Sequence, residues 1–166
     1  MVRVLPVLHI LSFIIMILSG FMTLPLLASI ALQDGASLAY DQAIFATGMS
    51  GFLLWLATRK HKQELQIRDG FLLVSLVWTV LPAFAMLPLL IQIPGLSLTD
   101  AYFEGVSGLT ASGGTVLTGL DALPYSVNLW RGMLIWLGGM GIIVLAVAIL
   151  PLLGVGGSQV FKAETP

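Results

Sequence analysis

The chain has 166 residues, of which 58% are hydrophobic and only 9% are charged, and its formal net charge is −1. A typical soluble domain is about 25% charged, so this composition argues against a soluble domain and favours an integral membrane protein. The chain contains no cysteine, which excludes disulfide bridges, thiolate metal sites and cysteine nucleophiles.

Four apolar runs are long enough to cross a bilayer as helices, which takes about 20 residues. They cover residues 4–32, 42–58, 70–91 and 132–155. The first run resembles a secretory signal, but the apolar core of a signal peptide is only about 7–15 residues long. We therefore expect an all-α, multi-pass membrane protein with four transmembrane helices.

The charged residues predict the orientation of these helices. Residues 59–69 hold four basic side chains, and positively charged short loops stay in the cytoplasm. Both termini are then cytoplasmic, and Arg131 is an exception on the outer side, where its side chain is expected to extend toward the interface. An acidic outer entrance would concentrate cations, although external loops also need polarity for solubility alone. The acidic residues on the outer side are Asp34, Asp41, Asp100, Glu104 and Asp121.

The segment between the third and fourth runs has to leave and re-enter the outer face. Thr99 is expected to cap a short helix, with Asp100 in its first turn. The stretch "GLTASGGTVLTGL" (108–120) follows and is rich in glycine and hydroxyl groups. Irregular backbone at membrane depth is tolerated only where protein buries it or water reaches it. Residues 108–120 are therefore expected to form either a re-entrant pore loop, whose carbonyl oxygens replace water around a cation, or an ordinary external loop.

The motifs "YFEGVSGLTASGGTVL", "LWRGMLIWLGGMGIIVLAVAILPLLGVGG" and "FKAETP" carry a resemblance to a known family. Over nearly its whole length the chain resembles the TrkH-type potassium uptake proteins of the Trk/Ktr/HKT superfamily. The resemblance implies four M1–P–M2 repeats around one pore in a single polypeptide. Residues 1–69 would form two leading helices and a basic cytoplasmic loop. Residues 70–166 would form the first repeat, with an outer helix at 70–91, a pore helix and filter at 99–116, and an inner helix at 129–153.

The resemblance also implies a selectivity filter built around Gly113. The potassium-binding segment would be Thr110, Ala111, Ser112, Gly113, Gly114 and Thr115, with the backbone carbonyls of the first four as direct ligands. Family members more often read T-T-T-G-A-T here, so Ala111 and Ser112 depart from the pattern. These departures are acceptable because the filter consists mostly of backbone. Glu104 is expected to support the loop by accepting amide hydrogen bonds; alternatively, its charge adds to the field at an outer cation site.

The last apolar run contains Gly138, Gly139 and Gly141. Small residues let helices approach closely, so we expect these glycines to pack the last helix against the short helix. A hinge for gating is the alternative.

These features together predict potassium uptake across the bacterial cytoplasmic (inner) membrane, without enzymatic activity and without a cofactor. A membrane-embedded lipid-modifying enzyme is one alternative, but such enzymes need acid–base groups or metal ligands, and the chain offers only Asp100 and Glu104 as a close carboxylate pair. A non-transporting remnant is the other. One repeat supplies about a quarter of a filter, so the chain is expected to be a fragment of a longer protein; assembly of four copies of the chain is the alternative. The resemblance implies membrane lipid, the remaining pore repeats, a second copy in a homodimer and a nucleotide-binding TrkA-like regulatory subunit as partners; no nucleic acid is expected.

Overall fold

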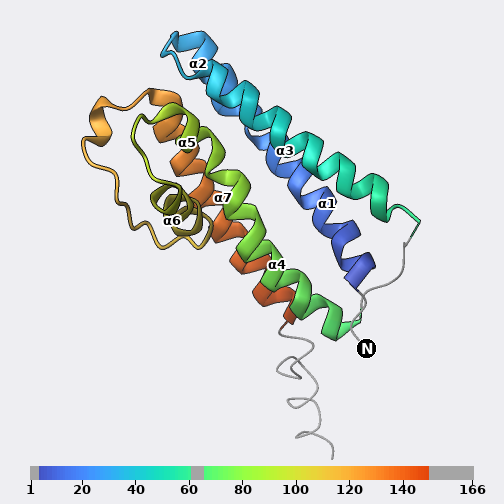
Figure 1. Cartoon of the computed structure of the whole chain (residues 1–166). Helices are drawn as coiled ribbons and strands as arrows, with labels where there is room; N and C mark the ends of the chain where they lie inside the picture. The colour runs from blue at the N-terminus through green and yellow to red at the C-terminus, as the bar shows by residue number, and fades with distance from the viewer. Residues whose placement is uncertain (1–3, 61–65, 150–166) are drawn as a thin grey trace, which may run out of the picture.

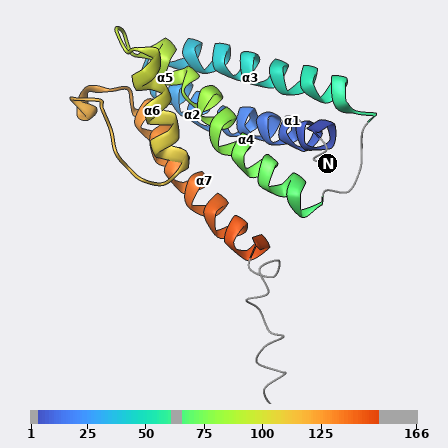
Figure 2. The ribbon, with the colours of Figure 1, turned by 60° about the horizontal axis from the view of Figure 1, so that its bottom comes forward.

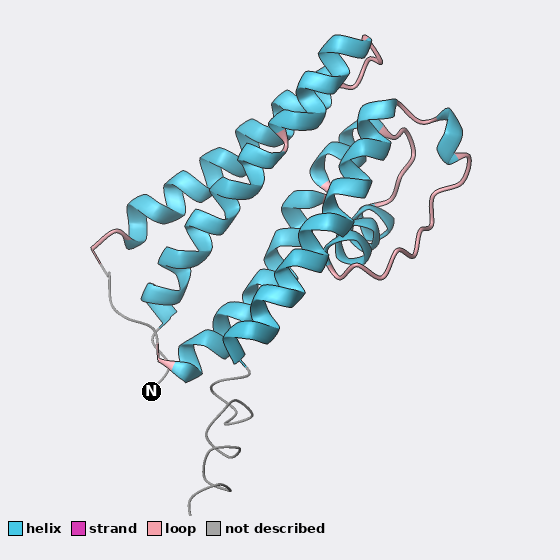
Figure 3. Cartoon of the chain, turned by 180° about the vertical axis from the view of Figure 1, so that it is seen from behind, coloured by secondary structure: helices cyan, strands magenta, loops and turns pink. Residues whose placement is uncertain are grey.

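The computed structural model describes residues 4–60 and 66–149. Within these residues the fold is helical and contains no strand (Figure 3). The helices form an elongated bundle, with α2 and α5 at one end and the N-terminus at the other (Figure 1). We refer to these as the α2–α5 end and the N-terminal end. The all-α fold expected from the apolar runs is therefore confirmed.

The first three helices form an antiparallel hairpin. α1 (Val4–Phe21) continues almost directly into α2 (Thr23–Leu32), and together they form an apolar segment of 29 residues, in which an 18-residue stretch has a mean hydropathy of 2.3. The chain reverses at residues 33–36, where Gly35 has a φ of 82°, in the left-handed region that glycine reaches without strain. α3 (Ser37–Thr58) then returns along α1 (Figure 1).

The next apolar segment is interrupted near its end. α4 (Ile67–Ala85) and α5 (Leu87–Gln92) form most of it, and within the 25 residues Arg68–Gln92 an 18-residue stretch has a mean hydropathy of 2.2. Pro88 lies in the first turn of α5. Proline has no amide hydrogen and cannot donate the hydrogen bond to the carbonyl four residues earlier that a continuous helix would need. The segment therefore breaks at Met86.

Within the described residues, two helical segments are long and apolar enough to cross a membrane, Val4–Leu32 and Arg68–Gln92, and they contain the expected runs 4–32 and 70–91. The other two are also helical: α3 covers the second, and α7 (Tyr125–Ile149) begins before the expected start of the fourth. The expected end of the last helix at residue 153 or 155, the tail after it and part of the basic loop, residues 61–65, lie outside the described residues.

A short helix, α6 (Leu98–Leu109), crosses the bundle at a steep angle and contacts both α4 and α7 (Figures 1 and 2). Glycines make both contacts close. A Cβ added to Gly105 would lie 2.7 Å from the carbonyl oxygen of Pro82 in α4, and one added to Gly108 would lie 2.7 Å from the Cβ of Leu134 in α7. Residues with side chains at these two positions would hold α6 away from both neighbours.

The glycines of α7 differ in their surroundings. A Cβ added to Gly138 would lie only 2.1 Å from the carbonyl oxygen of Leu109, at the carboxyl end of α6. The expected packing of the last helix against the short helix is thus confirmed for Gly138. A Cβ on Gly139 or Gly141 would meet nothing within 4 Å in the described part of the chain, so these two glycines make no such contact here.

The hairpin and the later helices share one core. Trp130 of α7 and Tyr40 of α3 are both fully buried. The indole Nε1 of Trp130 donates to the carbonyl oxygen of Ala85 over 2.9 Å, and the hydroxyl of Tyr40 donates to the carbonyl oxygen of Ser126 over 2.9 Å. These two bonds tie α7 to the carboxyl end of α4 and to α3, so the start of α7 is fixed from two sides.

Candidate functional site

The candidate site is built on α6, whose start is capped by Ser97. The Ser97 hydroxyl oxygen accepts the amide of Asp100 over 3.1 Å, and the same hydroxyl donates to the Asp100 carboxylate over 2.8 Å. The expectation that Thr99 caps this helix is therefore wrong, because the helix already begins at Leu98. Asp100 does lie in the first turn, where a carboxylate is favoured by the amide groups at the helix start.

The backbone changes direction directly after α6. The amides of Ala111 and Ser112 fold back onto the helix and donate to the carbonyl oxygens of Gly108 and Ser107, over 2.8 and 3.1 Å. Ala111 then has a φ of 54° and Gly113 a φ of 72°, so two residues of the loop occupy the left-handed region. Such a conformation costs a residue with a Cβ roughly 1–2 kcal/mol. Gly113 takes it freely, whereas Ala111 bears the cost.

The loop carbonyls fall into two groups. Among the hydrogen bonds of the described residues, none is accepted by the carbonyl oxygens of residues 110–113. The carbonyl oxygen of Gly114, in contrast, accepts the hydroxyl of Ser107. The side chain of Thr110 turns back to donate to Val106, over 2.8 Å. All six predicted filter residues are exposed in this chain, and the loop lies at the carboxyl end of α6, where the helix dipole is negative.

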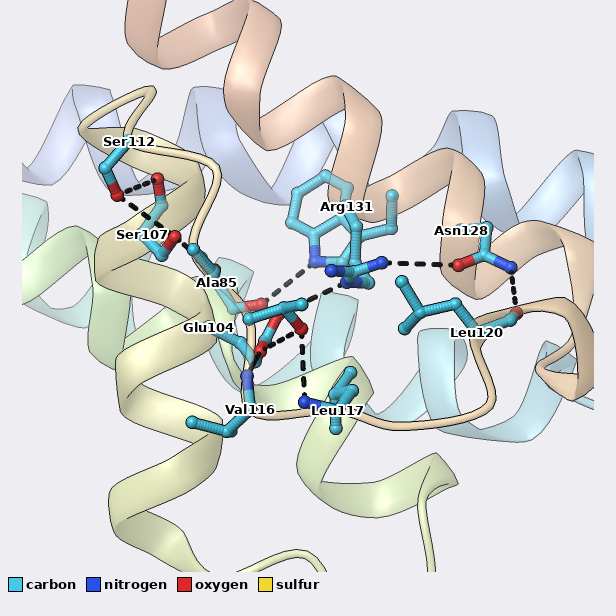
Figure 4. Close-up of polar contacts among 12 residues, drawn as sticks. Ala85, Glu104, Ser107, Ser112, Val116, Leu117, Leu120, Asn128 and Arg131 are labelled. Atoms are coloured by element: carbon cyan, nitrogen blue, oxygen red, sulfur yellow. Dashed lines mark hydrogen bonds and ion pairs between the residues drawn. The ribbon is translucent and has the colours of Figure 1, made fainter.

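Glu104 lies behind the loop and is almost completely enclosed, with 3% of its side chain exposed. Its Oε1 accepts two hydrogen bonds from the loop, one from the Thr115 hydroxyl over 2.6 Å and one from the Val116 amide over 2.8 Å (Figure 4). The Thr115 oxygen in turn accepts the amide of Leu117 over 3.1 Å. One carboxylate oxygen therefore fixes three consecutive residues of irregular backbone.

The other carboxylate oxygen of Glu104 pairs with Arg131 of α7. The guanidinium Nε donates to Oε2 over 3.2 Å, and 18% of the Arg131 side chain is exposed. Asn128, one turn earlier on α7, donates from Nδ2 to the carbonyl oxygen of Leu120 over 2.7 Å (Figure 4). Sequence reasoning missed this arrangement and assigned Arg131 to the membrane interface, because Glu104 and Arg131 are 27 residues apart and no local pattern links them.

The acidic residues expected on one side of the membrane do not form a single cluster. Glu104 bonds to the loop and to Arg131, and Asp100 bonds to Ser97 at the start of its own helix. Asp41 and Asp121 are exposed. No group of three or more acidic, histidine or cysteine side chains that could hold a metal ion occurs within residues 4–60 and 66–149.

Asp34 joins the hairpin to α7. Its Oδ1 accepts the hydroxyl of Ser29 and, over 3.1 Å, the amide of Ala36, while its Oδ2 accepts the amide of Ser126 over 2.9 Å. Burial alone would raise the pKa of the Asp34 carboxyl, but the hydrogen bonds from Ser29, Ser126 and Ala36 outweigh it and leave the pKa below its ordinary value of 3.8. The carboxylate thus stabilises both the hairpin turn and the first turn of α7.

A comparison with known proteins identifies the family. The TrkH family model, which describes a cation transport protein, matches residues 36–166. The chain belongs to the TrkH family of cation transport proteins. This membership confirms the resemblance carried by the motifs around Gly113 and in the last helix.

Individual TrkH proteins match nearly the whole chain. The chain is 49% identical over 159 residues to the Trk system potassium uptake protein TrkH of Escherichia coli K12, and the match covers 95% of this chain and 33% of that protein. It is 46% identical over 161 residues to the TrkH of Vibrio parahaemolyticus, covering 96% and 33%. The chain therefore spans about one third of the length of these relatives.

The fold matches as well. The crystal structure of the potassium transporter TrkH from Vibrio parahaemolyticus superposes with a TM-score of 0.86 at 42% identity, covering 97% of this chain and 35% of that one. The helical membrane-protein fold expected from the sequence is confirmed by this match. The TrkH relatives are transport proteins.

Proposed function

We propose that this chain forms part of a potassium uptake pore and supplies one of its selectivity-filter segments. The chain covers about a third of the length of its relatives. The proposal therefore includes the remaining pore repeats as partners that complete the pore with this chain. In this proposal, residues 1–69 form two leading helices with a basic loop, and residues 70–166 form the first M1–P–M2 repeat. We assign transport rather than catalysis because the family and its members are transport proteins, and we propose no cofactor; K⁺ is the cargo.

The geometry of the loop carries the proposal. Four successive carbonyl oxygens, those of Thr110, Ala111, Ser112 and Gly113, accept no hydrogen bond from the described residues and lie at the negative end of α6. Carbonyl oxygens in such an arrangement can replace the hydration shell of K⁺. The left-handed φ of Gly113 turns the chain within this segment. Gly114 and Thr115 complete it, although the Gly114 carbonyl is engaged by Ser107.

Glu104 has a supporting role in this proposal. Its Oε1 accepts the Thr115 hydroxyl and the Val116 amide, which belong to the last residue of the filter segment and the first residue after it. A carboxylate that accepts backbone and hydroxyl donors forms stronger hydrogen bonds than a neutral acceptor. Fixing the end of the filter segment and the loop after it limits the movement of the filter carbonyl groups.

The proposal also includes an orientation. We place the α2–α5 end outside and the N-terminal end, with both termini, in the cytoplasm of a bacterial cell, since the basic loop stays inside. Cysteines introduced at the exposed positions Asp121 and Lys60 should then react with a membrane-impermeant reagent from opposite sides. Reaction of both from outside the cell would refute this orientation. A homodimer and a nucleotide-binding TrkA-like subunit on the cytoplasmic face are part of the same proposal.

The central test replaces Gly113 with serine. The experiment uses a chimera in which this chain replaces the matching third of the Vibrio parahaemolyticus transporter, in cells without other potassium uptake systems. Because a Cβ at a left-handed φ costs roughly 1–2 kcal/mol, the ratio of rubidium to sodium uptake is expected to fall about tenfold, with normal amounts of protein in the membrane.

Gly20→Ser is the matched control, since a Cβ at Gly20 would meet no atom of the described residues within 4 Å and the residue lies in α1, far from the loop along the chain. This control should keep the parent ratio. An unchanged ratio in Gly113→Ser would show that the loop is not a filter.

A further inference from the structure

We infer that Arg131 is a positioning residue for ion selectivity, which acts by fixing Glu104 against the loop and by joining the loop to α7. This inference rests on the proposed function and adds a residue to it. The Arg131–Glu104 contact is an ion pair between α7 and α6. It lies immediately behind the proposed filter rather than at the surface of the bundle.

The burial of Glu104 explains why a cation is needed beside it. With 3% of its side chain exposed, the carboxylate has little water around it, and a buried charge without a partner is strongly unfavourable. Its Oε1 is already used by Thr115 and Val116. The guanidinium occupies the remaining oxygen, so Arg131 lets an ionised carboxylate stay where it can hold the loop.

The same turn of α7 also holds the far side of the loop. The Nη1 of Arg131 lies 3.5 Å from the Oδ1 of Asn128, a long contact, and the Nδ2 of Asn128 donates to the carbonyl oxygen of Leu120 over 2.7 Å. The irregular segment between α6 and α7 is thus tied to α7 at two places, near its middle through Glu104 and near its end through Asn128. A displacement of the first turns of α7 would therefore move the loop with it.

A simpler role for Arg131 would be that its ion pair with Glu104 only holds α6 and α7 together. That joining already has other causes, because Gly108 packs on Leu134 and Gly138 packs on Leu109 at backbone distance. The two hydrogen bonds accepted by Glu104 from the loop give the ion pair a second function that helix packing alone does not require.

The test compares Arg131→Gln with the parent in the chimera described above. The rubidium-to-sodium uptake ratio is expected to fall about tenfold, the size that loss of a charge-assisted hydrogen bond predicts, at equal amounts of protein in the membrane. Glu104→Gln should lower the ratio similarly. The double variant should lose no more than the worse single variant, because both changes remove one interaction.

Arg131→Lys separates charge from geometry. Lysine keeps the positive charge but lacks the planar Nε–H donor, so we expect a ratio between those of the parent and Arg131→Gln. If Arg131→Gln does not accumulate in the membrane, Arg131→Lys takes its place in the comparison. Arg59→Gln, at an exposed position after α3, is the matched control and should keep the parent ratio.

The outcomes are distinct. A parent ratio in Arg131→Gln, or in Arg131→Lys where only that variant accumulates, overturns the inference, even if total uptake falls. Additive losses in the double variant also overturn it. If either of these two outcomes is found while Gly113→Ser lowers the rubidium-to-sodium ratio, the filter proposal stands and only the role of Arg131 fails. A parent chimera without preference for rubidium overturns both.

Discussion

The leading hairpin and the segment from α6 to the start of α7 are stabilised in different ways. In the hairpin, backbone groups are satisfied within the helices, which pack through apolar side chains, a close contact of Gly51 with Met16 and a few side-chain hydrogen bonds, such as that from the Ser19 hydroxyl to the carbonyl oxygen of Ile44 over 3.0 Å. Between α6 and α7 the backbone is irregular, and individual side chains satisfy it: Glu104, Ser107 and Asn128 all bond to loop backbone groups. The first region should therefore tolerate small changes that the second does not.

The largest expected effect is that of Gly138→Ala. Its Cβ would lie 2.1 Å from the backbone carbonyl oxygen of Leu109, and backbone cannot move aside as a side chain can. We expect a loss of about 3 kcal/mol of unfolding free energy, at the upper end for overpacking. The measurement is the thermal unfolding midpoint of the purified chain in detergent.

Two matched glycines test whether this sensitivity is local. Gly51→Ala in the hairpin brings its Cβ to 2.8 Å from the Cγ of Met16 and to 3.2 Å from the Met16 backbone nitrogen; because the backbone is farther away than at Gly138, a smaller loss of about 1–2 kcal/mol is expected. The Cβ of Gly139→Ala would meet nothing within 4 Å among the described residues, so this change should not destabilise the chain. Equal losses at Gly138 and Gly51 would contradict the contrast between the two regions.

Asp34 connects the two regions, and its removal should have an intermediate effect. Asp34→Ala leaves the amides of Ala36 and Ser126 and the hydroxyl of Ser29 without their acceptor. Loss of an acceptor from partly buried donors costs about 1–3 kcal/mol. The same unfolding measurement at neutral pH checks this value.

The effect of Asp34 should also depend on pH. Because its pKa in the folded chain lies below the ordinary 3.8, its contribution to stability is complete above that value and is lost as the pH falls through the folded pKa. Asp34→Asn should therefore show a weaker loss of stability in acid than the parent. Asp41→Asn, at an exposed position, should follow the parent curve; a parent-like acid curve in Asp34→Asn would refute the assignment.

The smallest expected effect is a gain. Ala111 has a φ of 54°, so Ala111→Gly removes the strain of a left-handed residue but adds chain entropy to the unfolded state. We expect a net gain of about 0.5 kcal/mol. Ala122→Gly, in the short turn η1 (Leu120–Ala122) without a positive φ, should lower stability instead. A loss in both variants would mean that the strain at Ala111 is not relieved.

The helices could be predicted from the sequence because long apolar runs have few alternatives in a bilayer. The packing of Gly138 against α6 was also predictable, since a glycine within an apolar helix indicates close approach. The break at Met86 was not expected, because the apolar run continues through it, although Pro88 marks it in retrospect. The cap was placed at Thr99 instead of Ser97 because both are good capping residues two positions apart.

The polar network could be predicted only in part. Glu104 stands out as a carboxylate among apolar neighbours, which marks it for attention. Its partner Arg131 and the bond between Asn128 and Leu120 depend on how α6 and α7 meet in space. The junction of Asp34 with Ser126 spans 92 residues and has no sequence pattern at all. Contacts of this kind follow from the fold and cannot precede it.

That junction has a consequence for biogenesis. The hairpin turn that carries Asp34 is synthesised before α7, so a hairpin that has formed by then would present the carboxylate and the Tyr40 hydroxyl to Ser126. The start of α7 can therefore dock onto a finished surface as it enters the bilayer. The leading helices would then serve as an assembly template for the inner helix.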